Sequence, residues 1–234
     1  MKYGFVIPVY RHGATLESVV KSLAGFEFPI IVVDDGNDEE NRNLIAAVAQ
    51  KYPLVTVVTR PKNGGKGRAM ISGIYKAHEM GLTHILQLDS DGQHDAARAD
   101  RFFELSRQNP DAIICGYPQY DATAPKSRVN GRKFANGWIH IVTLSGQIKD
   151  AMIGFRIYPV APFVKMYWRG VPVISEPVKV FYPADGISNY HYFKDTLRLT
   201  SVYSRLCIGM IFHAPLLLFR KIRNAGKTRG TKSE

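Results

Sequence analysis

Short segments that are apolar on both sides alternate with amphipathic segments through the first half of the chain, and this alternation constrains the fold most. Strands are expected at residues 5–9, 30–33, 54–58, 84–88 and 112–115. Helices are expected at residues 15–23, 39–50, 68–80 and 97–108, where apolar side chains recur every three or four positions. Strands without a polar face are buried on both sides, so the pattern predicts an α/β fold with a mostly parallel sheet covered by helices.

The second half is less regular. A helix is expected at residues 129–144, strands at 171–174 and 178–181, and a long, increasingly apolar helix at 192–219. A basic, polar and flexible tail is expected from residue 220 to residue 234.

Charge and composition narrow the class of protein. The 234 residues are 45% hydrophobic and 22% charged, which is ordinary for a globular chain and suits one α/β domain with an appendage. The 31 Lys and Arg exceed the 20 Asp and Glu, which gives a net charge of +11 and predicts an anionic partner. No recognition helix, zinc site or aromatic RNA-binding strand is evident, so a nucleic-acid partner is not expected.

The sequence also makes predictions about compartment and membrane. The two cysteines, Cys115 and Cys207, are too few for a disulfide scaffold and predict a reducing, cytosolic compartment. No signal peptide is expected, because residues 1–4 lead directly into a strand pattern. No apolar stretch reaches the roughly 18–20 residues that a membrane-spanning helix needs, so none is expected.

Polar residues gather where the predicted strands end. Tyr10 follows the first strand, Asp34 and Asp35 the second, residues 63–67 the third, and residues 89–94 the fourth. In open parallel sheets, ligands bind beyond the carboxyl ends of the strands. The sequence therefore predicts one ligand site built from these four segments.

Asp89 and Asp91 are candidate metal ligands. Two carboxylates one residue apart at a strand end suit Mg²⁺ or Mn²⁺, which in turn can hold a diphosphate, and Gln93 could add a carbonyl oxygen. The same residues fit a turn that caps the next helix. They also resemble a haloacid-type phosphatase pair, although that pattern belongs on the first strand and has Thr or Val where Gln93 stands.

Two further segments have competing interpretations. Asp35 could accept a hydrogen bond from a nucleobase ring N–H, or it could cap a helix. In the glycine-rich residues 63–67, Lys66 would place positive charge beside a diphosphate, but the segment could equally be only a turn. It is not a Walker loop, because no Ser or Thr follows the lysine.

Together these motifs resemble family 2 glycosyltransferases, whose A-type fold is a Rossmann-like α/β domain that binds nucleotide sugars. The order and spacing of four runs carry the resemblance, at residues 7–10, 32–37, 63–67 and 89–94. The dolichol-phosphate mannosyltransferase branch and its bacterial relatives are most similar. Residues 150–156 match the Asp…Gly-Phe-Arg segment of that branch, and residues 176–188 its Glu-x-Pro-Val…Gly-x-Ser segment. The resemblance covers residues 3–190.

The resemblance implies roles for individual residues. It assigns Pro8, Tyr10 and Asp35 to the nucleotide, and Asp89, Asp91 and Gln93 to the metal and diphosphate, with Lys66 alongside. Arg128 and Arg132, one helical turn apart, match the region that binds an acceptor phosphate, although they could also form a solvated basic face. Asp89, Asp91, Arg128 and Arg132 are the expected catalytic set. The implied reaction is inverting, metal-assisted hexosyl transfer from a nucleotide diphosphate donor to a membrane lipid or lipid phosphate.

One segment departs from the family. After Arg156 the family has a helix, an acidic Phe-Asp-x-Glu motif and a second helix, whereas residues 159–166 here lead directly into residues 167–173. The difference is either a natural deletion or a loop missing from the sequence as written. A lipid phosphate acceptor needs no general base, but a hydroxyl acceptor does. A catalytically impaired protein that binds nucleotide sugars as a membrane partner is therefore the alternative.

The C-terminal region is interpreted as a separate unit. Residues 1–190 are expected to form the catalytic domain, and residues 191–234 an amphipathic interfacial helix with a basic tail. Residues 206–219 are apolar, and Arg220, Lys221 and Arg223 follow them. This order predicts peripheral attachment to the anionic cytoplasmic face of a membrane. The alternative is a core-packing helix with a solvated tail.

Overall fold

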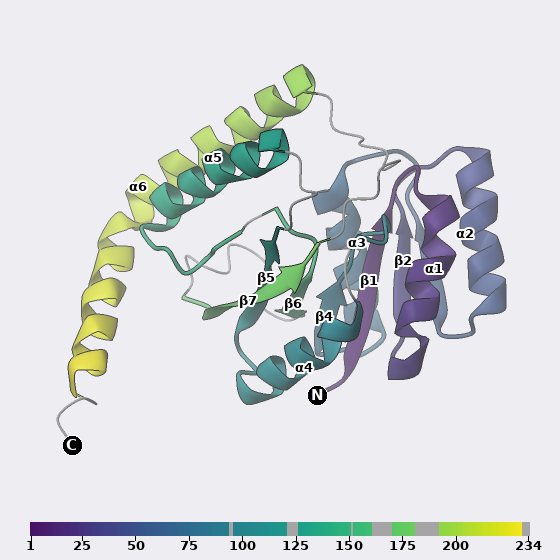
Figure 1. The fold of residues 1–234 in the computed structure, drawn as a ribbon, viewed down its shortest axis with the longest axis horizontal. Coiled ribbons are helices and arrows are strands. Elements are labelled where there is room, and N and C mark those ends of the chain that lie inside the picture. The colour runs from purple at the N-terminus through teal and green to yellow at the C-terminus, as the bar shows by residue number, and fades with distance from the viewer. Residues whose placement is uncertain (94–95, 121–125, 151, 161–169, 181–191, 231–234) are drawn as a thin grey trace.

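A computed structural model describes residues 1–93, 96–120, 126–150, 152–160, 170–180 and 192–230. Within these residues seven strands form one sheet in the order β3-β2-β1-β4-β6-β5-β7 (Figure 1). The strands are β1 Tyr3–Val9, β2 Ile30–Asp34, β3 Val55–Thr59, β4 His84–Gln87, β5 Ile113–Gln119, β6 Arg156–Pro159 and β7 Val173–Lys179. Every neighbouring pair is parallel except the two pairs made by β6. The predicted α/β fold with a mostly parallel sheet is confirmed.

Six α-helices lie among the described residues. They are α1 Gly13–Leu23, α2 Glu39–Lys51, α3 Lys66–Glu79, α4 Ala99–Gln108, α5 Lys126–Thr143 and α6 Tyr192–Gly230. Local chemistry starts α2, because the Asp38 side chain at its N-cap accepts a hydrogen bond from the Asn41 amide at 3.0 Å. The apolar face of α1 is buried against the sheet, through Leu16, Val20 and Leu23.

Helices cover both faces of the sheet because alternate strand residues point in opposite directions. Val6, Ile31 and Ile85 pack against α3 on one face. Phe5, Ile7, Val32 and Leu86 face a larger core that α1, α2 and α4 close on the other face. This two-sided burial explains why the strand sequences lack a polar side.

Three expectations for the second half need correction. The sequence analysis did not anticipate β6, which lies between β4 and β5. Its Arg and Tyr side chains interrupt the apolar pattern that is typical of the other strands. The two strands expected at 171–174 and 178–181 are the single strand β7, and residues 181–191 lie outside the described part of the chain. Pro177 is accommodated inside β7 because this strand is at the sheet edge, with β5 as its neighbour. The tail expected to be flexible from residue 220 continues α6 to Gly230.

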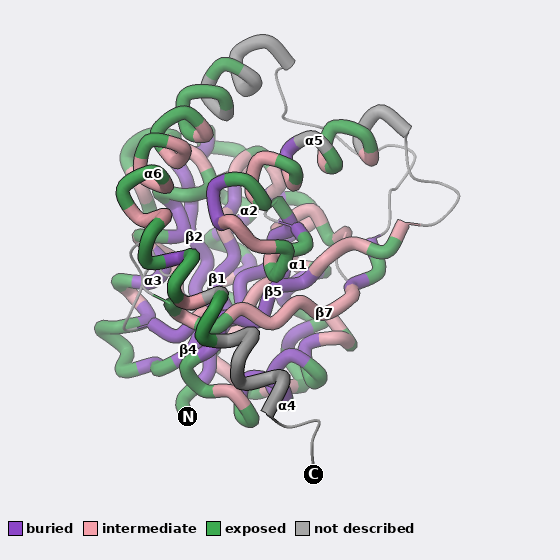
Figure 2. Tube along the Cα trace, turned by 90° about the vertical axis from the view of Figure 1, so that its left-hand side faces the viewer, coloured by how far each residue is buried: buried purple, intermediate pink, exposed green. Residues whose placement is uncertain are grey.

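The helices α5 and α6 lie side by side and apart from the helices that cover the sheet (Figure 1). The rings of Trp138 in α5 and Tyr203 in α6 stack with their centroids 6.1 Å apart. Beyond the end of α5, α6 continues away from the sheet (Figure 1). Most of the described side chains of α6 are exposed or only partly buried (Figure 2).

The expectation that no segment could span a membrane was wrong. The 21 residues Thr200–Arg220 of α6 are long and apolar enough to do so by length and composition, with a mean hydropathy of 1.6. The sequence count began at Leu206, directly after the charged Arg205, and so left out residues 200–205 of this segment.

Candidate active site

The register of the sheet places three polar residues side by side at the carboxyl ends of neighbouring strands. Val9, Asp34 and Thr59 are partners across β1, β2 and β3, so the next residues, Tyr10, Asp35 and Arg60, leave the sheet side by side. The neighbouring strand β4 pairs with β1 on its other side, and Asp89 follows it. The strand order reverses between β1 and β4, and open α/β sheets bind ligands at such a switch point.

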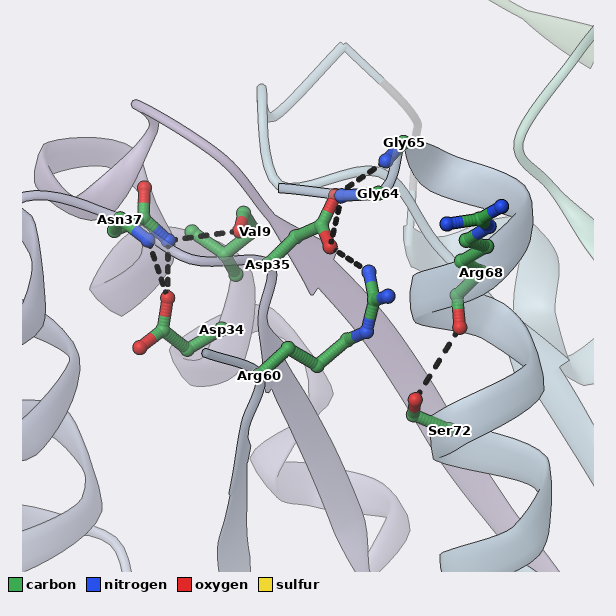
Figure 3. A network of polar contacts seen from close by, with 9 residues as sticks. All are labelled: Val9, Asp34, Asp35, Asn37, Arg60, Gly64, Gly65, Arg68 and Ser72. Carbon is green, nitrogen blue, oxygen red and sulfur yellow. Dashed lines mark hydrogen bonds and ion pairs between the residues drawn. The ribbon is translucent and has the colours of Figure 1, made fainter. Parts of the chain in front are cut away.

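The carboxylate of Asp35 is held by the glycine-rich segment and by Arg60 (Figure 3). Its Oδ1 accepts from the Gly64 amide at 3.1 Å, its Oδ2 accepts from the Gly65 amide at 2.9 Å, and Arg60 forms an ion pair with it. Both charged side chains are largely buried. The sequence analysis missed Arg60, although its position directly after a strand at the predicted site was a usable signal.

Two glycines allow the glycine-rich segment to approach Asp35. Gly36 has a φ of +72°, and a Cβ there would overlap the backbone of residues 62 and 63. Gly65 has a φ of +84° and immediately precedes α3. Both backbone conformations are ones that residues with side chains rarely adopt, so the two glycines fix the shape of the turn.

Asp34 has a structural role. The Asn37 side chain donates to Asp34 Oδ1 at 2.7 Å and to the Val9 carbonyl at 2.9 Å (Figure 3). The Oδ1 of Asn37 also accepts from the Arg11 amide at 2.6 Å. These bonds join the ends of β1 and β2, and they hold the backbone that carries Tyr10 and Asp35. Pro8 lies in β1 and is partly buried, and the Tyr10 ring lies 5.2 Å from the guanidinium carbon of Arg11.

Asp89 lies between Lys66 and Gly154. Lys66 Nζ, in the first turn of α3, is 2.5 Å from Asp89 Oδ1. On the other side, a Cβ at Gly154 would overlap the Asp89 carboxylate, so this carboxylate rests directly on the glycine backbone. The predicted Lys66 and Asp89 therefore meet, and the Gly-Phe-Arg segment forms one wall of the site.

Asp91 and Gln93 form a local turn in which the backbone amide of Gln93 donates to Asp91 Oδ1 at 3.0 Å. The described residues contain no cluster of three His, Cys, Asp or Glu side chains placed to hold a metal ion. His94, the last residue of the motif, is outside the described residues. The two aspartates supply hard oxygen donors, which suits a cation that takes its other ligands from substrate phosphates.

Arg132 is tied to the buried Asp150. Its Nη1 lies 3.3 Å from both carboxylate oxygens of Asp150, a residue that is 1% exposed. Asp150 also accepts from the Asn136 side chain at 3.2 Å and from the Ile153 amide at 2.7 Å. These bonds connect α5 to the loop that carries Gly154. Arg128 lies in α5 one turn earlier, and its side chain is outside the described part of the chain.

Tyr158 and Gln87 form a partly buried polar pair near the site. The Tyr158 hydroxyl donates to Gln87 Oε1 at 3.1 Å, which links β6 to the last residue of β4. Burial raises the pKa of Tyr158 and so keeps its hydroxyl protonated as a donor. Because Asp89 lies only two residues beyond Gln87, this bond stabilises the strand end that carries it.

The fold is a Rossmann-like α/β domain that gathers acidic and basic groups at the switch point of its sheet. The profile of Glycosyl transferase family 2 matches residues 5–171. The chain belongs to this family, as the sequence motifs implied.

Curated relatives add detail. The chain is 31% identical over 176 residues to a dolichyl-phosphate beta-glucosyltransferase of Trichomonas vaginalis, an alignment that covers 66% of this chain and 50% of the relative. It is 29% identical over 118 residues to a dolichol-phosphate mannosyltransferase of Pyrococcus furiosus, covering 49% of this chain and 32% of the relative. The chain thus spans half or less of the length of these relatives.

A solved structure confirms the fold. Glucosyl-3-phosphoglycerate synthase of Mycobacterium tuberculosis, in complex with Mn²⁺ and UDP-glucose, superposes with a TM-score of 0.66 at 14% identity. The match covers 89% of this chain and 78% of that one. At this identity the likeness establishes a shared architecture.

Proposed function

We propose that the protein transfers a hexose from a nucleotide diphosphate donor to a lipid phosphate at a membrane, with inversion at the anomeric carbon. The observation that carries the proposal is the Lys66–Asp89 pair at the switch point of the sheet, one strand away from Tyr10 and two strands away from Asp35. Family membership and the names of the curated relatives support it.

In this proposal Pro8, Tyr10 and Asp35 hold the base and ribose of the donor. The backbone amides of Gly64 and Gly65 and the Arg60 side chain donate to the Asp35 carboxylate, and the Gly64 amide is within hydrogen-bond distance of both oxygens. Arg60 and the glycine-rich segment therefore orient Asp35 for the base.

The donor diphosphate is assigned to Lys66, Asp89, Asp91 and Gln93. Mg²⁺ or Mn²⁺ fits this set, because such ions bind enzymes through one or two carboxylates and complete their shell with substrate phosphates. When bound, the cation neutralises charge that develops on the leaving diphosphate. Lys66 supplies a further positive charge beside the same group.

Arg132, and Arg128 on the preceding turn of α5, are assigned to the acceptor phosphate. The Asp150 carboxylate fixes the Arg132 guanidinium and leaves one of its edges for an anion. An ionised phosphate already carries a nucleophilic oxygen, so the reaction needs no general base. The absence of acidic residues from positions 157–172 is compatible with this acceptor.

Residues 191–234 are assigned to membrane attachment, and residues 1–190 to catalysis. The face of α6 that points away from the domain carries exposed Ile208, Ile211, Phe212, Phe219 and Ile222. The opposite face packs on α5 through Tyr203, and Leu217 further along the helix is buried. A helix with protein along one side fits the interface better than the bilayer centre. The proposed location is the cytoplasmic face of a membrane, with an anionic surface.

Donor binding tests the site. We expect calorimetry to detect UDP-glucose binding to the wild type that requires Mn²⁺, and Asp91→Asn to lose it. Asp100→Asn, an exposed carboxylate on α4, is the matched control and should bind as the wild type does. Equal affinity of wild type and Asp91→Asn, with and without Mn²⁺, would contradict the assignment.

Vesicle binding tests the attachment. The double variant Phe212→Ser/Phe219→Ser removes two rings that are 79% and 62% exposed. We expect a smaller fraction of this variant than of the wild type to co-sediment with anionic vesicles. Tyr75→Ser, an exposed aromatic on α3, is the control. Unchanged co-sedimentation of the double variant would assign the membrane contact to another surface.

The short segment after β6 favours a second candidate, a nucleotide-sugar-binding partner protein without turnover. Transfer and donor binding separate the two functions. If the wild type binds a nucleotide sugar, yet mass spectrometry finds no glycolipid after incubation with a panel of donors and lipid phosphates, the partner function is correct.

A further inference from the structure

We propose that a pocket at the end of the domain opposite the donor site binds the phosphate headgroup of one membrane lipid. The pocket has a volume of about 350 Å³, within the range of small-molecule sites. Its lining includes Thr143, Ser145, Gly146, Gln147, Leu217 and Arg220. The inference rests on the membrane attachment in the proposed function, and it adds a specific lipid site that the transfer reaction does not require.

The pocket is separate from the donor site. Its wall includes Val173, the first residue of β7, which pairs with Ile113, the first residue of β5. The donor residues follow the carboxyl ends of the parallel strands, whereas this pocket lies near the opposite ends of the strands. A ligand here therefore does not compete with the nucleotide sugar.

Arg220 gives the pocket its charge. It is the last residue of the apolar segment Thr200–Arg220, where the sequence of α6 changes from apolar to basic. The Arg220 guanidinium lies against Gly170, where a Cβ would be 2.8 Å from Cζ. Gly170 thus makes room for this side chain to reach the pocket wall.

The wall combines groups that suit a lipid phosphate. Arg220 supplies a cation, the Ser145 hydroxyl and the Gln147 amide lie in the same lining, and the buried Leu217 lies one turn before Arg220. Exposed Leu216 and Phe219 on the adjacent surface of α6 continue the apolar path toward the proposed membrane. An anionic headgroup at Arg220 with acyl chains along α6 matches this arrangement of charge and apolar surface.

The number of charges on the lipid is also constrained. The C-terminal end of α5 lies in the same wall, and the carbonyl end of a helix carries a partial negative charge. One arginine beside that end favours a singly charged phosphodiester over a doubly charged phosphomonoester. Phosphatidylglycerol is therefore the probe of choice.

The test is native mass spectrometry of the full chain with short-chain phosphatidylglycerol. We expect one lipid per chain, a loss of about tenfold in affinity for Arg220→Gln, and no loss for Arg223→Gln, an exposed arginine on the same helix. Gly146→Trp keeps every charge but adds a bulky side chain at the lining of the pocket, at a position where a Cβ meets nothing within 4 Å. It should also lose the lipid.

Three outcomes would overturn the pocket. They are retention of the lipid by both Arg220→Gln and Gly146→Trp, equal loss in Arg220→Gln and Arg223→Gln, and displacement of the lipid by inorganic phosphate. Circular dichroism identifies a variant that has not folded. If either Arg220→Gln or Gly146→Trp is unfolded, the other variant tests whether the pocket binds the lipid. Co-sedimentation of the wild type with vesicles is measured separately, so failure of membrane attachment is distinguishable from failure of the pocket.

Discussion

Gly154 shows how closely the site is built at the level of single residues. The Asp89 carboxylate occupies the space that a side chain at position 154 would fill, while Lys66 contacts its other side. Phe155, the next residue, packs edge-on against Phe102 of α4 with ring centroids 4.7 Å apart. The core therefore holds the glycine against the aspartate, and neither can move far without the other.

We predict that Gly154→Ala displaces Asp89 and lowers Mn²⁺-dependent affinity for UDP-glucose by roughly 5- to 100-fold, since a misplaced charged ligand costs on the order of 1–3 kcal/mol. Gly137→Ala in α5, where a Cβ meets nothing within 4 Å, is the control and should leave binding unchanged. Calorimetry of the two variants measures the contrast. Equal affinities would show that Asp89 tolerates displacement.

The two cysteines should differ in reactivity. Cys115 is 5% exposed in β5, and burial raises the pKa of its thiol, so less of it is thiolate at any given pH. Cys207 is partly exposed on α6. We expect iodoacetamide to label the partly exposed Cys207 first, because Cys115 is buried and stays largely protonated. Mass spectrometry of the peptides measures both rates, and similar labelling of the two in the folded protein would contradict the prediction.

At the level of elements, α5 is the connection between the two proposed substrate sites. Arg132 on α5 reaches Asp150, whose oxygens also accept the amides of the loop before Gly154. Asp150 is thus bonded to the helix assigned to the acceptor and to the loop that supports Asp89. Asp150 serves to position both groups.

We predict that Asp150→Asn raises the KM for a lipid phosphate acceptor by about tenfold, because the ion pair that orients Arg132 is lost. The KM for the donor should rise less, since Lys66 still contacts Asp89. A double-mutant cycle with Arg132→Gln should show coupling of roughly 0.5–3 kcal/mol in kcat/KM for the acceptor. Additive effects would mean that Asp150 does not act through Arg132.

The sequence predicted the elements with local signals and missed those that depend on distant pairing. The strands that end at Val9, Asp34 and Gln87 are apolar on both faces, and their polar ends identified Tyr10, Asp35 and Asp89. In contrast, β6 is short and contains Arg156 and Tyr158, whose burial between β4 and β5 no local pattern indicates. Arg60 was missed although it follows a predicted strand, and the register of β2 and β3 explains why it lies beside Asp35. The extension of α6 beyond residue 219 was missed because residues 220–230 are basic and polar and carry no apolar periodicity.

On the scale of the whole molecule, charge and apolar surface are both concentrated toward one end of the chain. The net charge is +11, and basic residues follow the exposed apolar side chains of α6. Each buried aliphatic or aromatic side chain contributes about 1.5–3 kcal/mol at full burial, compared with about 1 kcal/mol for a cation near an anionic surface.

We therefore expect high salt to weaken vesicle binding only partly. Co-sedimentation across a salt series measures this, with the Phe212→Ser/Phe219→Ser variant as the comparison. That variant should keep the salt-sensitive part of the binding and lose the rest. Complete release of the wild type by salt would mean that the attraction is electrostatic alone.

The parallel course of α5 and α6 has a kinetic consequence. Both helices begin on the side of the molecule where the site lies and run away from it together (Figure 1). If α6 lies flat in one leaflet, the end of the sheet that carries the site faces along the membrane plane. An acceptor lipid then arrives by lateral diffusion within that leaflet. The enzyme would then sense the mole fraction of acceptor in the surface, so diluting the acceptor with inert lipid should slow turnover even when its bulk concentration is unchanged.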